Sequence, residues 1–477
     1  MELIRGQPPV RRRDDVDAGS GAVGEREPLA AEALEAGGGQ LLSDGVRLRR
    51  PREKVQIPAF RRERAVDDDA VRQRAVDPQG EASYERLSIL VPVHPRVLLV
   101  GDAYYASLAA VRGLRLGGYE PWLATSASRT YASRSRAIAG TVLVPDPARG
   151  EGPFVGALIS AAARFRAAAV LPATESALVA LAGRQGDFPA GIALGGGSPA
   201  VVARAGDKVL LAAFAAEAGL RSPVSETIRT ADLPARADVL GYPLVVKPVR
   251  SAVTVDGATI PLPPARLVHG ADELAGFLAG LPATDWLAQR HVPGQLYAVS
   301  GVATGGELVC AVHQVARRIY PRLAGASAFA ETVPRDQALE AKIGALVGAI
   351  GWSGIYEAQL IRTDDGAYLI DFNPRPYGSM ALAIAAGLNL PAIWADLVLG
   401  RDAAVDGEYR AGVRFRAEER DVRALAEELR DGRRLHAITA ALPRRGTAHA
   451  VLSLRDPAPS LGLLASARSV IRRSPAA

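Results

Sequence analysis

The sequence of 477 residues contains one cysteine and few aromatic residues, and each shortage argues against a class of protein. A single thiol, Cys310, cannot form an internal disulfide or a multi-thiolate metal site, so nothing in the chain requires an oxidising compartment, and a cytoplasmic location is expected. Aromatic residues make up 5% of the chain, and the C-terminal arginines alternate with acidic residues. A dedicated nucleic-acid surface is therefore not expected.

Long apolar runs are also missing. The N-terminal sequence MELIRGQPPVRRRDD lacks the apolar core of a signal peptide. Residues 376–395 are uncharged for twenty positions, but Pro376, Gly378, Gly387 and Pro391 interrupt them. We expect no membrane partner from this composition.

The first 88 residues have little apolar content of the kind that builds a core. They hold 16 basic and 17 acidic residues and two aromatic ones, Phe60 and Tyr84. This composition predicts a disordered extension over residues 1–88. An arm that binds nucleic acid or a protein partner is the alternative interpretation.

An ordered region is predicted to begin at the apolar run 94–101. Further strands are expected at 119–124, 141–144 and 168–171, with helices at 107–116 and 155–165. This alternation predicts an α/β unit with a parallel sheet over residues 95–200. No second or third glycine follows Gly101, so the glycine-rich turn of a dinucleotide-binding fold is absent.

From Gly206 the pattern changes to that of an α+β body. A helix is predicted at 208–218, strands at 243–248 and 286–292, a strand pair around 297–315, and a helix at 337–350. A hairpin, 355–362 with 367–373, follows. Residues 401–477 are predicted to form an appendage with a helix at 421–430 and a strand at 448–454.

Lysine is rare in this sequence: the chain has 57 Lys plus Arg, of which only four are lysines. Lys247 lies within the apolar strand LVVKP, where its charge needs a polar site or a partner. A phosphate-binding role is the favoured interpretation, and a strand-edge lysine that reaches solvent is the alternative. Lys208 follows Gly206-Asp207 at a helix start, which favours anions, although a surface lysine fits equally well.

The hairpin GIYEAQLIRTDDGAYLIDFNPRP carries a set of oxygen donors. If Asp364-Asp365-Gly366 forms a three-residue loop, Gln359 faces Asp371 and Glu357 faces Asn373, on one side of the hairpin. Such hard donors suit Mg²⁺, and Arg375, two residues further on, could neutralise a phosphoryl group. The alternative is an exposed polar face.

The order of Asp207-Lys208, YPLVVKP, WLAQRHVPG, YEAQ, LIDFNPRPYGS and AAGLNLP resembles that in the ATP-grasp superfamily, in particular its carbamoyl-phosphate-synthetase-like and carboxylate-amine ligase branch. The likeness spans residues 95 to 400. It implies an α/β domain followed by an ATP-grasp domain of two α+β subdomains over residues 201–400.

The resemblance also implies roles for individual residues. Lys208 and Lys247 would contact the ATP phosphates, Arg375 would stabilise the transferred phosphoryl group, and Gln295 is a candidate for the ribose. The segment Gln289, Arg290, His291 and Val292 would present its backbone to adenine. Gln359, Asp371 and Asn373, with Glu357 as a further ligand, would hold Mg²⁺ or Mn²⁺. In place of the family's glycine-rich loop, the chain has RSAVTVDG at 250–257, which leaves closure over the phosphates open.

The implied activity is that of a ligase that phosphorylates a small-molecule carboxylate with ATP and joins the acyl phosphate to an amine, releasing ADP and phosphate. A nucleotide-binding module without turnover and a carboxylating enzyme that uses bicarbonate are the alternatives. A homodimer is the candidate assembly. The sequence does not name the carboxylate or the amine.

Deleting residues 1–88 should leave both the melting midpoint and the affinity for ATP unchanged, because a segment with so little apolar surface cannot dock on the body. Differential scanning calorimetry and nucleotide titration of the truncated and full chains measure this. A midpoint lowered by several degrees would show that the segment packs on the rest of the chain.

Overall fold

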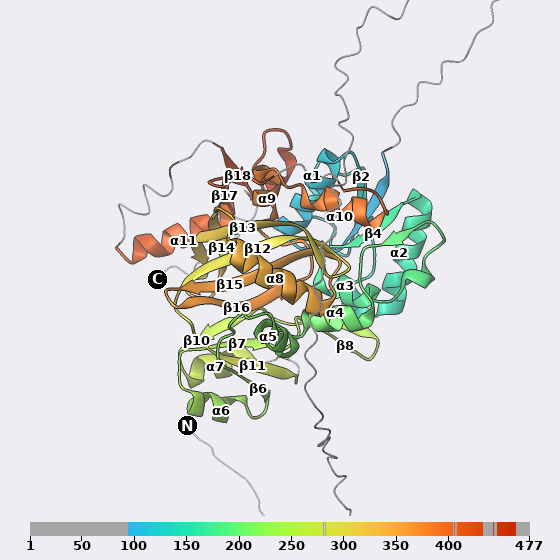
Figure 1. Ribbon diagram of the computed structural model, residues 1–477. Helices are drawn as coiled ribbons and strands as arrows, with labels where there is room; N and C mark the ends of the chain where they lie inside the picture. The colour runs from blue at the N-terminus through green and yellow to red at the C-terminus, as the bar shows by residue number, and fades with distance from the viewer. Residues whose placement is uncertain are drawn as a thin grey trace, which may run out of the picture. The chain divides into compact units, whose positions relative to one another are not determined.

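The computed structural model describes residues 94–279, 281, 283–403, 405, 408–432, 442 and 446–463. The chain divides into two compact units, Met1–Leu87 and Ser88–Ala477. The predicted extension, 1–88, lies outside the described residues, and everything below concerns the second unit. Within it the main chain forms three principal sheets (Figure 1).

The first sheet is parallel and has the order β3-β2-β1-β4-β5. Its strands are β1 (Arg96–Val100), β2 (Glu120–Thr125), β3 (Gly140–Leu143), β4 (Ala169–Pro172) and β5 (Ala193–Leu194). Its helices are α1 (Tyr105–Leu116), α2 (Glu151–Phe165) and α3 (Glu175–Leu181). The predicted α/β fold of this region is confirmed, and each predicted strand and helix lies within a few residues of its observed bounds.

Alternation along β1 explains why this sheet is covered on both faces. Val97 and Leu99 pack in one apolar cluster with α1, whereas Leu98 and Val100 pack in another with α2 and α3. Successive side chains of a strand point to opposite faces, so a fully apolar run needs helices on each side.

The second sheet is antiparallel, with the order β10-β7-β11-β6. Its strands are β6 (Ser225–Arg229), β7 (Leu244–Pro248), β10 (Arg266–Val268) and β11 (Asp285–Arg290), and helices α6 (Leu233–Leu240) and α7 (Ala271–Leu278) cover one face. Leu244, Val246 and the fully buried Trp286 belong to that core. By alternation, Lys247 lies on the opposite face, and this opposite face is turned toward the third sheet.

The third sheet has the order β16-β15-β12-β13-β14-β17-β18. Its strands are β12 (Gln295–Thr304), β13 (Glu307–Tyr320), β14 (Ala326–Thr332), β15 (Gly354–Thr363), β16 (Gly366–Asn373), β17 (Arg414–Arg416) and β18 (Thr447–His449). The helices associated with it are α8 (Gln337–Ile350), α9 (Met380–Ala386), α10 (Leu390–Val398) and α11 (Glu418–Arg430). Helix α8 has the predicted bounds. The strand predicted at 448–454 is shorter, and the helix predicted at 421–430 begins three residues earlier.

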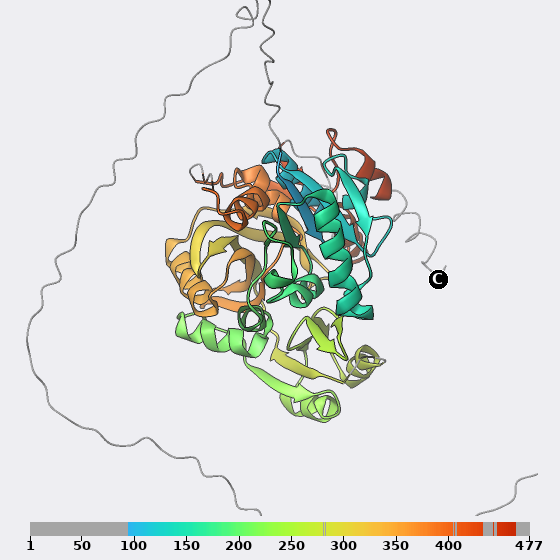
Figure 2. The same ribbon diagram turned by 90° about the vertical axis from the view of Figure 1, so that its right-hand side faces the viewer.

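Residues 250–257, where the resemblance implied a glycine-rich loop, form the first strand and the turn of a β-hairpin. Its strands are β8 (Ala252–Val255) and β9 (Ala258–Pro261). Gly257, at its turn, has φ +72°, and its carbonyl oxygen accepts a hydrogen bond of 2.7 Å from the backbone N–H of Glu151. The hydroxyls of Thr254 and Thr259 donate to the Glu151 carboxylate. The hairpin is therefore fastened to the start of α2, and Figure 2 shows α2 reaching toward this part of the chain.

Two further helices complete the description: α4 (Pro199–Gly206) and α5 (Lys208–Glu217), which follow the first sheet. No single helix among the described residues is long and apolar enough to cross a membrane. Helices α9 and α10 would satisfy that test only together, and they are bent by 94°.

Candidate functional site

The hairpin of β15 and β16 has the side-chain pairing that the sequence predicts. Gln359 is opposite Asp371, and Glu357 is opposite Asn373. The four side chains therefore share one side of the hairpin, since cross-strand partners point the same way.

The predicted three-residue loop, however, is wrong. Thr363 pairs with Gly366, so the loop has two residues, Asp364 and Asp365. This shorter loop alone would shift the pairing by one residue and turn the donors to the wrong face. A β-bulge corrects the register, because Leu360 faces Leu369 while Gln359 faces Asp371, which leaves Ile370 without a partner opposite it.

The bulge also frees a carbonyl group for a buried lysine. The Lys247 ammonium donates to the carbonyl oxygen of Ile370 at 2.5 Å, and the Lys247 side chain is 4% exposed. Burial lowers the pKa of Lys247 to about 8; the carboxylate of Asp371 opposes this shift and the nearby Lys208 adds to it. Lys247 therefore joins the second sheet to the hairpin of the third.

Lys208 is the first residue of α5 and is also buried. Its ammonium donates to the hydroxyl of Ser251 at 3.1 Å and lies 3.8 Å from the carboxylate of Asp371. The preceding Asp207 caps the helix through two backbone N–H groups and accepts from Arg250 at 2.6 Å. This capping fixes the helix start, and with it the origin of the lysine side chain.

Glu357 is buried behind the row of donors and orients two of them. One of its carboxylate oxygens accepts from the amide of Gln359 at 2.9 Å and from that of Asn373 at 3.0 Å. Burial raises the pKa of Glu357 to about 7, although both amides and the charge of Arg375 oppose this shift. Because the NH₂ group of Asn373 donates to Glu357, the amide oxygen of Asn373 points the other way, toward Arg375.

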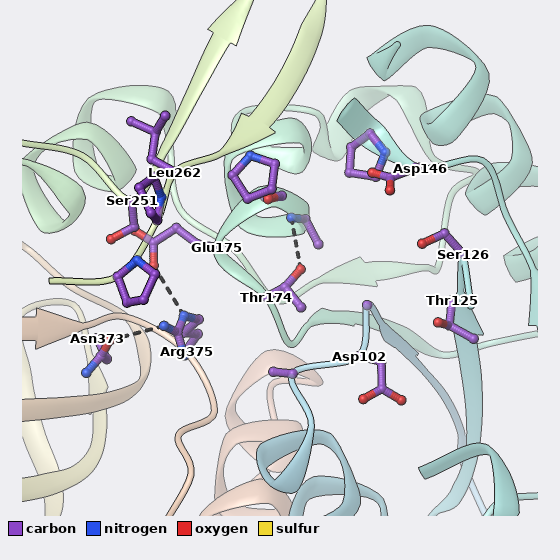
Figure 3. Close-up of a pocket in the computed structure, with 18 of the residues that line it drawn as sticks. Asp102, Thr125, Ser126, Asp146, Thr174, Glu175, Ser251, Leu262, Asn373 and Arg375 are labelled. Carbon is purple, nitrogen blue, oxygen red and sulfur yellow. Dashed lines mark hydrogen bonds and ion pairs between the residues drawn. The ribbon is translucent and has the colours of Figure 1, made fainter. Parts of the chain in front are cut away.

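Arg375 links the third sheet to the first. Its guanidinium donates to the Asn373 side-chain oxygen, to the Pro376 carbonyl and to the Glu175 carboxylate, each at 3.2 Å. Glu175 is the first residue of α3, directly after strand β4 and Thr174. Figure 3 shows Asn373, Arg375 and Glu175 connected in a row.

A cavity of about 600 Å³ lies where these groups meet. Its polar and charged lining side chains come from all three sheets and the β8–β9 hairpin: Asp102, Thr125, Ser126, Asp146, Thr174, Glu175, Ser176, Lys208, Lys247, Ser251, Asp371, Asn373 and Arg375. In Figure 3, Asp102, Thr125 and Ser126 lie on one side and Asn373 and Arg375 on another. The cavity is at the carboxyl ends of β1, β2 and β4, where the strand order of the first sheet reverses, which is the usual ligand position in such sheets.

A smaller cavity of about 120 Å³ adjoins the two lysines. Gln289 lines it, together with Ser225, whose hydroxyl accepts from the Gln289 amide at 3.0 Å. Lys208 and Lys247 line both cavities.

Four predicted nucleotide contacts lie outside these two cavities. Strand β11 ends at Arg290, two residues before the predicted end, and Arg290 is exposed. His291 and Val292 follow the strand, and Gln295 is the exposed first residue of β12. None of the four is among the residues that line either cavity.

The sequence reasoning missed the contribution of the first sheet. Asp102, Asp146 and Glu175 were not singled out, although each follows a predicted strand and strand ends of a parallel sheet commonly carry functional residues. Arg317 and Arg318, near the end of β13, are held in ion pairs with Glu331 and Asp421, respectively.

The donor set fits a hard divalent cation in part. Asp371 and Asn373 line the larger cavity and offer a carboxylate and an amide oxygen, which are ligands that Mg²⁺ accepts. Glu357 and Gln359 lie behind them, hydrogen-bonded to each other. Over the described part of the chain, no group of three or more His, Cys, Asp or Glu side chains is arranged to hold a metal ion.

Comparison with known proteins supports the fold and the resemblance that the motifs indicated. Residues 283–420 match the family described as ATP-grasp in the biosynthetic pathway with Ter operon. No curated protein shows significant similarity to the chain. The matched segment contains β12 to β16, and hence the hairpin that carries the oxygen donors.

Three solved structures illustrate the fold similarity. The L-amino acid ligase from Bacillus licheniformis has 16% identity and a TM-score of 0.50, over 67% of this chain and 78% of that one. The N5-carboxyaminoimidazole ribonucleotide synthetase purK, in its ADP complex, has 12% identity and a TM-score of 0.50, over 68% and 81%. A biotin carboxylase from Campylobacter jejuni has 15% identity and a TM-score of 0.50, over 67% of this chain and 74% of that one. The fold is that of ATP-grasp proteins, and the resemblance that the motifs indicated is confirmed.

Substituting Glu357 with Gln should change how stability depends on pH. The pKa of Glu357 is about 4.5 in the unfolded chain and is raised to about 7 in the folded chain. Between these two pH values the folded chain binds a proton that the unfolded chain has released. The stability that this group contributes is therefore present below pH 4.5 and is lost as the pH rises to 7. The variant lacks this effect. Urea unfolding measures the free energy of unfolding of both proteins at pH 5 and at pH 8. The variant minus wild-type difference should be larger at pH 8 than at pH 5 by on the order of 2 kcal/mol. A difference that stays constant with pH would contradict the burial of an ionisable Glu357.

Proposed function

We propose that the chain is an ATP-dependent ligase that phosphorylates a small-molecule carboxylate and joins the acyl phosphate to an amine, with release of ADP and phosphate. The observation that carries this proposal is the convergence of Lys208, Lys247 and Arg375 with Asp371 and Asn373 on one cavity of about 600 Å³. Lys208 and Lys247 are buried, and neither has a carboxylate within hydrogen-bond distance. Such cations favour a polyanionic ligand, and nucleotide phosphates are such a ligand.

The two lysines would receive the phosphates of ATP. Both are largely buried, and their direct partners are a carbonyl group, a hydroxyl and a carboxylate 3.8 Å away, so neither has a close ion pair of its own. The smaller cavity beside them is the candidate position for the adenine ring. Besides the two lysines, it is lined by Gln289, by the hydroxyl-bearing residues Ser222, Ser225 and Thr227, and by apolar residues. Arg290, His291, Val292 and Gln295 keep the roles that the family resemblance implies, as proposals.

Mg²⁺ held by the oxygens of Asp371 and Asn373 would neutralise phosphate charge and draw the phosphates toward these residues. Glu357 would support this site indirectly, because it holds the amide of Asn373 in place together with that of the neighbouring Gln359. Mn²⁺ has similar ligand preferences, so it should substitute.

Arg375 would neutralise the charge that develops as the phosphoryl group moves to the carboxylate. Its guanidinium is held by Glu175, Asn373 and Pro376, so it is positioned before the substrate arrives. The β8–β9 hairpin, fastened to Glu151, would limit the access of water to the acyl phosphate, which water would otherwise hydrolyse.

The reaction should release ADP, because the charged groups converge on the terminal phosphates. Changing Asp371 to Asn, which keeps the shape but removes the charge, should lower turnover by about 100- to 1,000-fold, since the loss of one such electrostatic contact costs roughly 3 to 4 kcal/mol. Coupled ADP release, and hydroxamate formation with hydroxylamine across a panel of carboxylates, measure it.

The matched control is Asp365→Asn, in the loop of the same hairpin. Asp365 is exposed and pairs with Arg221 away from the cavity, so this variant should retain the wild-type rate. AMP as the product, or an Asp371→Asn variant with an undiminished rate, would refute the mechanism. Nucleotide binding without ADP release would favour the module without turnover, and ADP release that depends only on bicarbonate would favour the carboxylating enzyme.

The specificity constant kcat/KM for ATP should fall as the pH rises above about 8, by up to tenfold per pH unit. The pKa of Lys247 in the free protein is lowered to about 8, so the ammonium that attracts phosphate is present below this pH and is lost above it. A Lys247→Arg variant, which keeps its charge, should move this fall to higher pH. Lys342→Arg, on the exposed side of α8, should not. A wild-type profile that is flat between pH 7 and 9 would contradict the role of Lys247.

The remaining expectations are proposals of the same kind. A cytoplasmic location agrees with a single buried cysteine, Cys310, and small-molecule partners agree with a cavity of about 600 Å³. A homodimer is proposed as the assembly, and size-exclusion chromatography with light scattering tests it.

A further inference from the structure

A second large cavity, of about 810 Å³, has a composition unlike the rest of the chain. Aromatic residues are only 5% of the sequence, yet four aromatic and four arginine side chains line this space. We call it the tyrosine–arginine cavity and define it by six of its lining residues: Tyr104, Tyr105, Tyr320, Glu419, Arg420 and Arg423. They come from the start of α1, from the end of β13 and from α11.

Two carboxylates line the cavity, and both are already bound. Glu273 accepts a hydrogen bond from the backbone N–H of His269 and lies 3.8 Å from the guanidinium of Arg266. The hydroxyls of Tyr104 and Tyr105 both donate to the same oxygen of Glu419, the latter at 3.0 Å. Glu419 therefore binds the two phenols, and within the described residues it forms no ion pair with the arginines that follow it on α11.

Arg420 and Arg423 are left without a carboxylate partner in the described part of the chain. Their guanidinium groups lie 5.3 Å and 5.8 Å from the ring centroids of Tyr105 and Tyr320, respectively. Other arginines near this helix are neutralised: Arg318 by Asp421 at 2.7 Å, and Arg322 by Asp431. Two guanidinium groups beside aromatic rings at a cavity wall form a site for a carboxylate or phosphate.

The backbone around the cavity is held in unusual conformations. Tyr104 has φ +61°, a conformation that is strained for a residue with a side chain and persists only where its surroundings hold it. Here the bond to Glu419 and the packing against Tyr105 and Tyr131 do so. On the opposite wall, a Cβ atom at Gly325 would lie 2.1 Å from the backbone of Tyr320, so only glycine allows this turn.

The tyrosine–arginine cavity adjoins the cavity that holds Arg375. Pro264 and Ala265, which follow the β8–β9 hairpin, line both. A single organic molecule can therefore extend past these two residues from one cavity into the other.

We propose that the tyrosine–arginine cavity binds the body of the carboxylate substrate and holds a second anionic group of that molecule at Arg420 and Arg423. That the bound molecule is the substrate rests on the proposed ligase function. The anion site at Arg420 and Arg423 does not, because it can be tested by binding alone. The substrate class is then an organic acid with at least two anionic groups, the second being a carboxylate or a phosphate.

Binding of matched acids without ATP tests the proposal. The full chain is titrated calorimetrically with succinate and glutarate against the monoanions butyrate and valerate, and with O-phosphoserine against serine. At least one dianion should bind 10-fold more tightly than its match, and whether it is a dicarboxylate or the phosphorylated compound identifies the second group. Equal binding within every pair would overturn the proposal.

The variants Arg420→Gln and Arg423→Gln should each weaken that dianion at least 10-fold while leaving the monoanion unchanged. Arg420→Lys and Arg423→Lys, which keep the charge, should recover part of the loss, and this separates charge from folding. Arg430→Gln, on the exposed end of the same helix, is the matched control and should bind like the wild type. Dianion binding that survives both Gln substitutions would overturn the assignment.

The Asp371→Asn variant separates this inference from the proposed function. If both hold, the variant binds the dianion normally and loses ADP release. If Asp371→Asn turns over normally while Arg423→Gln loses the dianion, the ligase mechanism fails and the anion site stands. If Asp371→Asn is inactive while no dianion is preferred, the mechanism stands and the anion site fails.

Discussion

The buried ammonium of Lys247 is the constraint on which the arrangement of the site depends. A lysine that is 4% exposed must have partners, and its direct one is a backbone carbonyl of another sheet, that of Ile370. A carbonyl in a regular ladder would already accept a hydrogen bond from its neighbouring strand. The bulge at Ile370 removes this competition, and the same bulge turns Asp371 and Asn373 toward the cavity. One irregularity in one strand thus serves both the lysine and the oxygen donors.

The charged groups around the larger cavity include three cations, Lys208, Lys247 and Arg375, and four carboxylates. Of the carboxylates, Glu175 is already bound to Arg375, and Asp371 is 3.8 Å from Lys208, too far for a close hydrogen bond. The pKa of Lys247 is lowered mainly by burial, and the nearby Lys208 adds to this shift. A polyanion that enters the cavity would favour the charged form of Lys247, so its binding and the protonation of this lysine should support each other.

How far the sequence predicts this molecule depends on the range of each interaction. Helix α8 at 337–350 and the pairing of Glu357 with Asn373 follow from local periodicity, and both are observed. The predicted loop length was wrong because Asp-Asp-Gly fits a two-residue or a three-residue turn equally well. The choice between them depends on the bulge at Ile370, and Lys247, 123 residues away in the sequence, stabilises this bulge. The contact of Arg375 with Glu175 spans 200 residues and joins two sheets, so no local pattern could reveal it.

The region after residue 400 contributes more to the site than its position as an appendage suggests. Asp421, buried on α11, accepts from Arg318 of β13 and pairs with Arg416 of β17, so this helix is fixed to the third sheet by charged contacts inside the protein. Removing one member of such a group would leave a buried charge uncompensated, which makes the position of the helix specific. Arg420 and Arg423, which lie on the same helix close to Asp421, are thereby held at the tyrosine–arginine cavity. The larger cavity is thus lined in part by the β15–β16 hairpin and the two lysines, whereas the tyrosine–arginine cavity depends on α1 and on this C-terminal helix, which lies largely beyond the residues that match the family model.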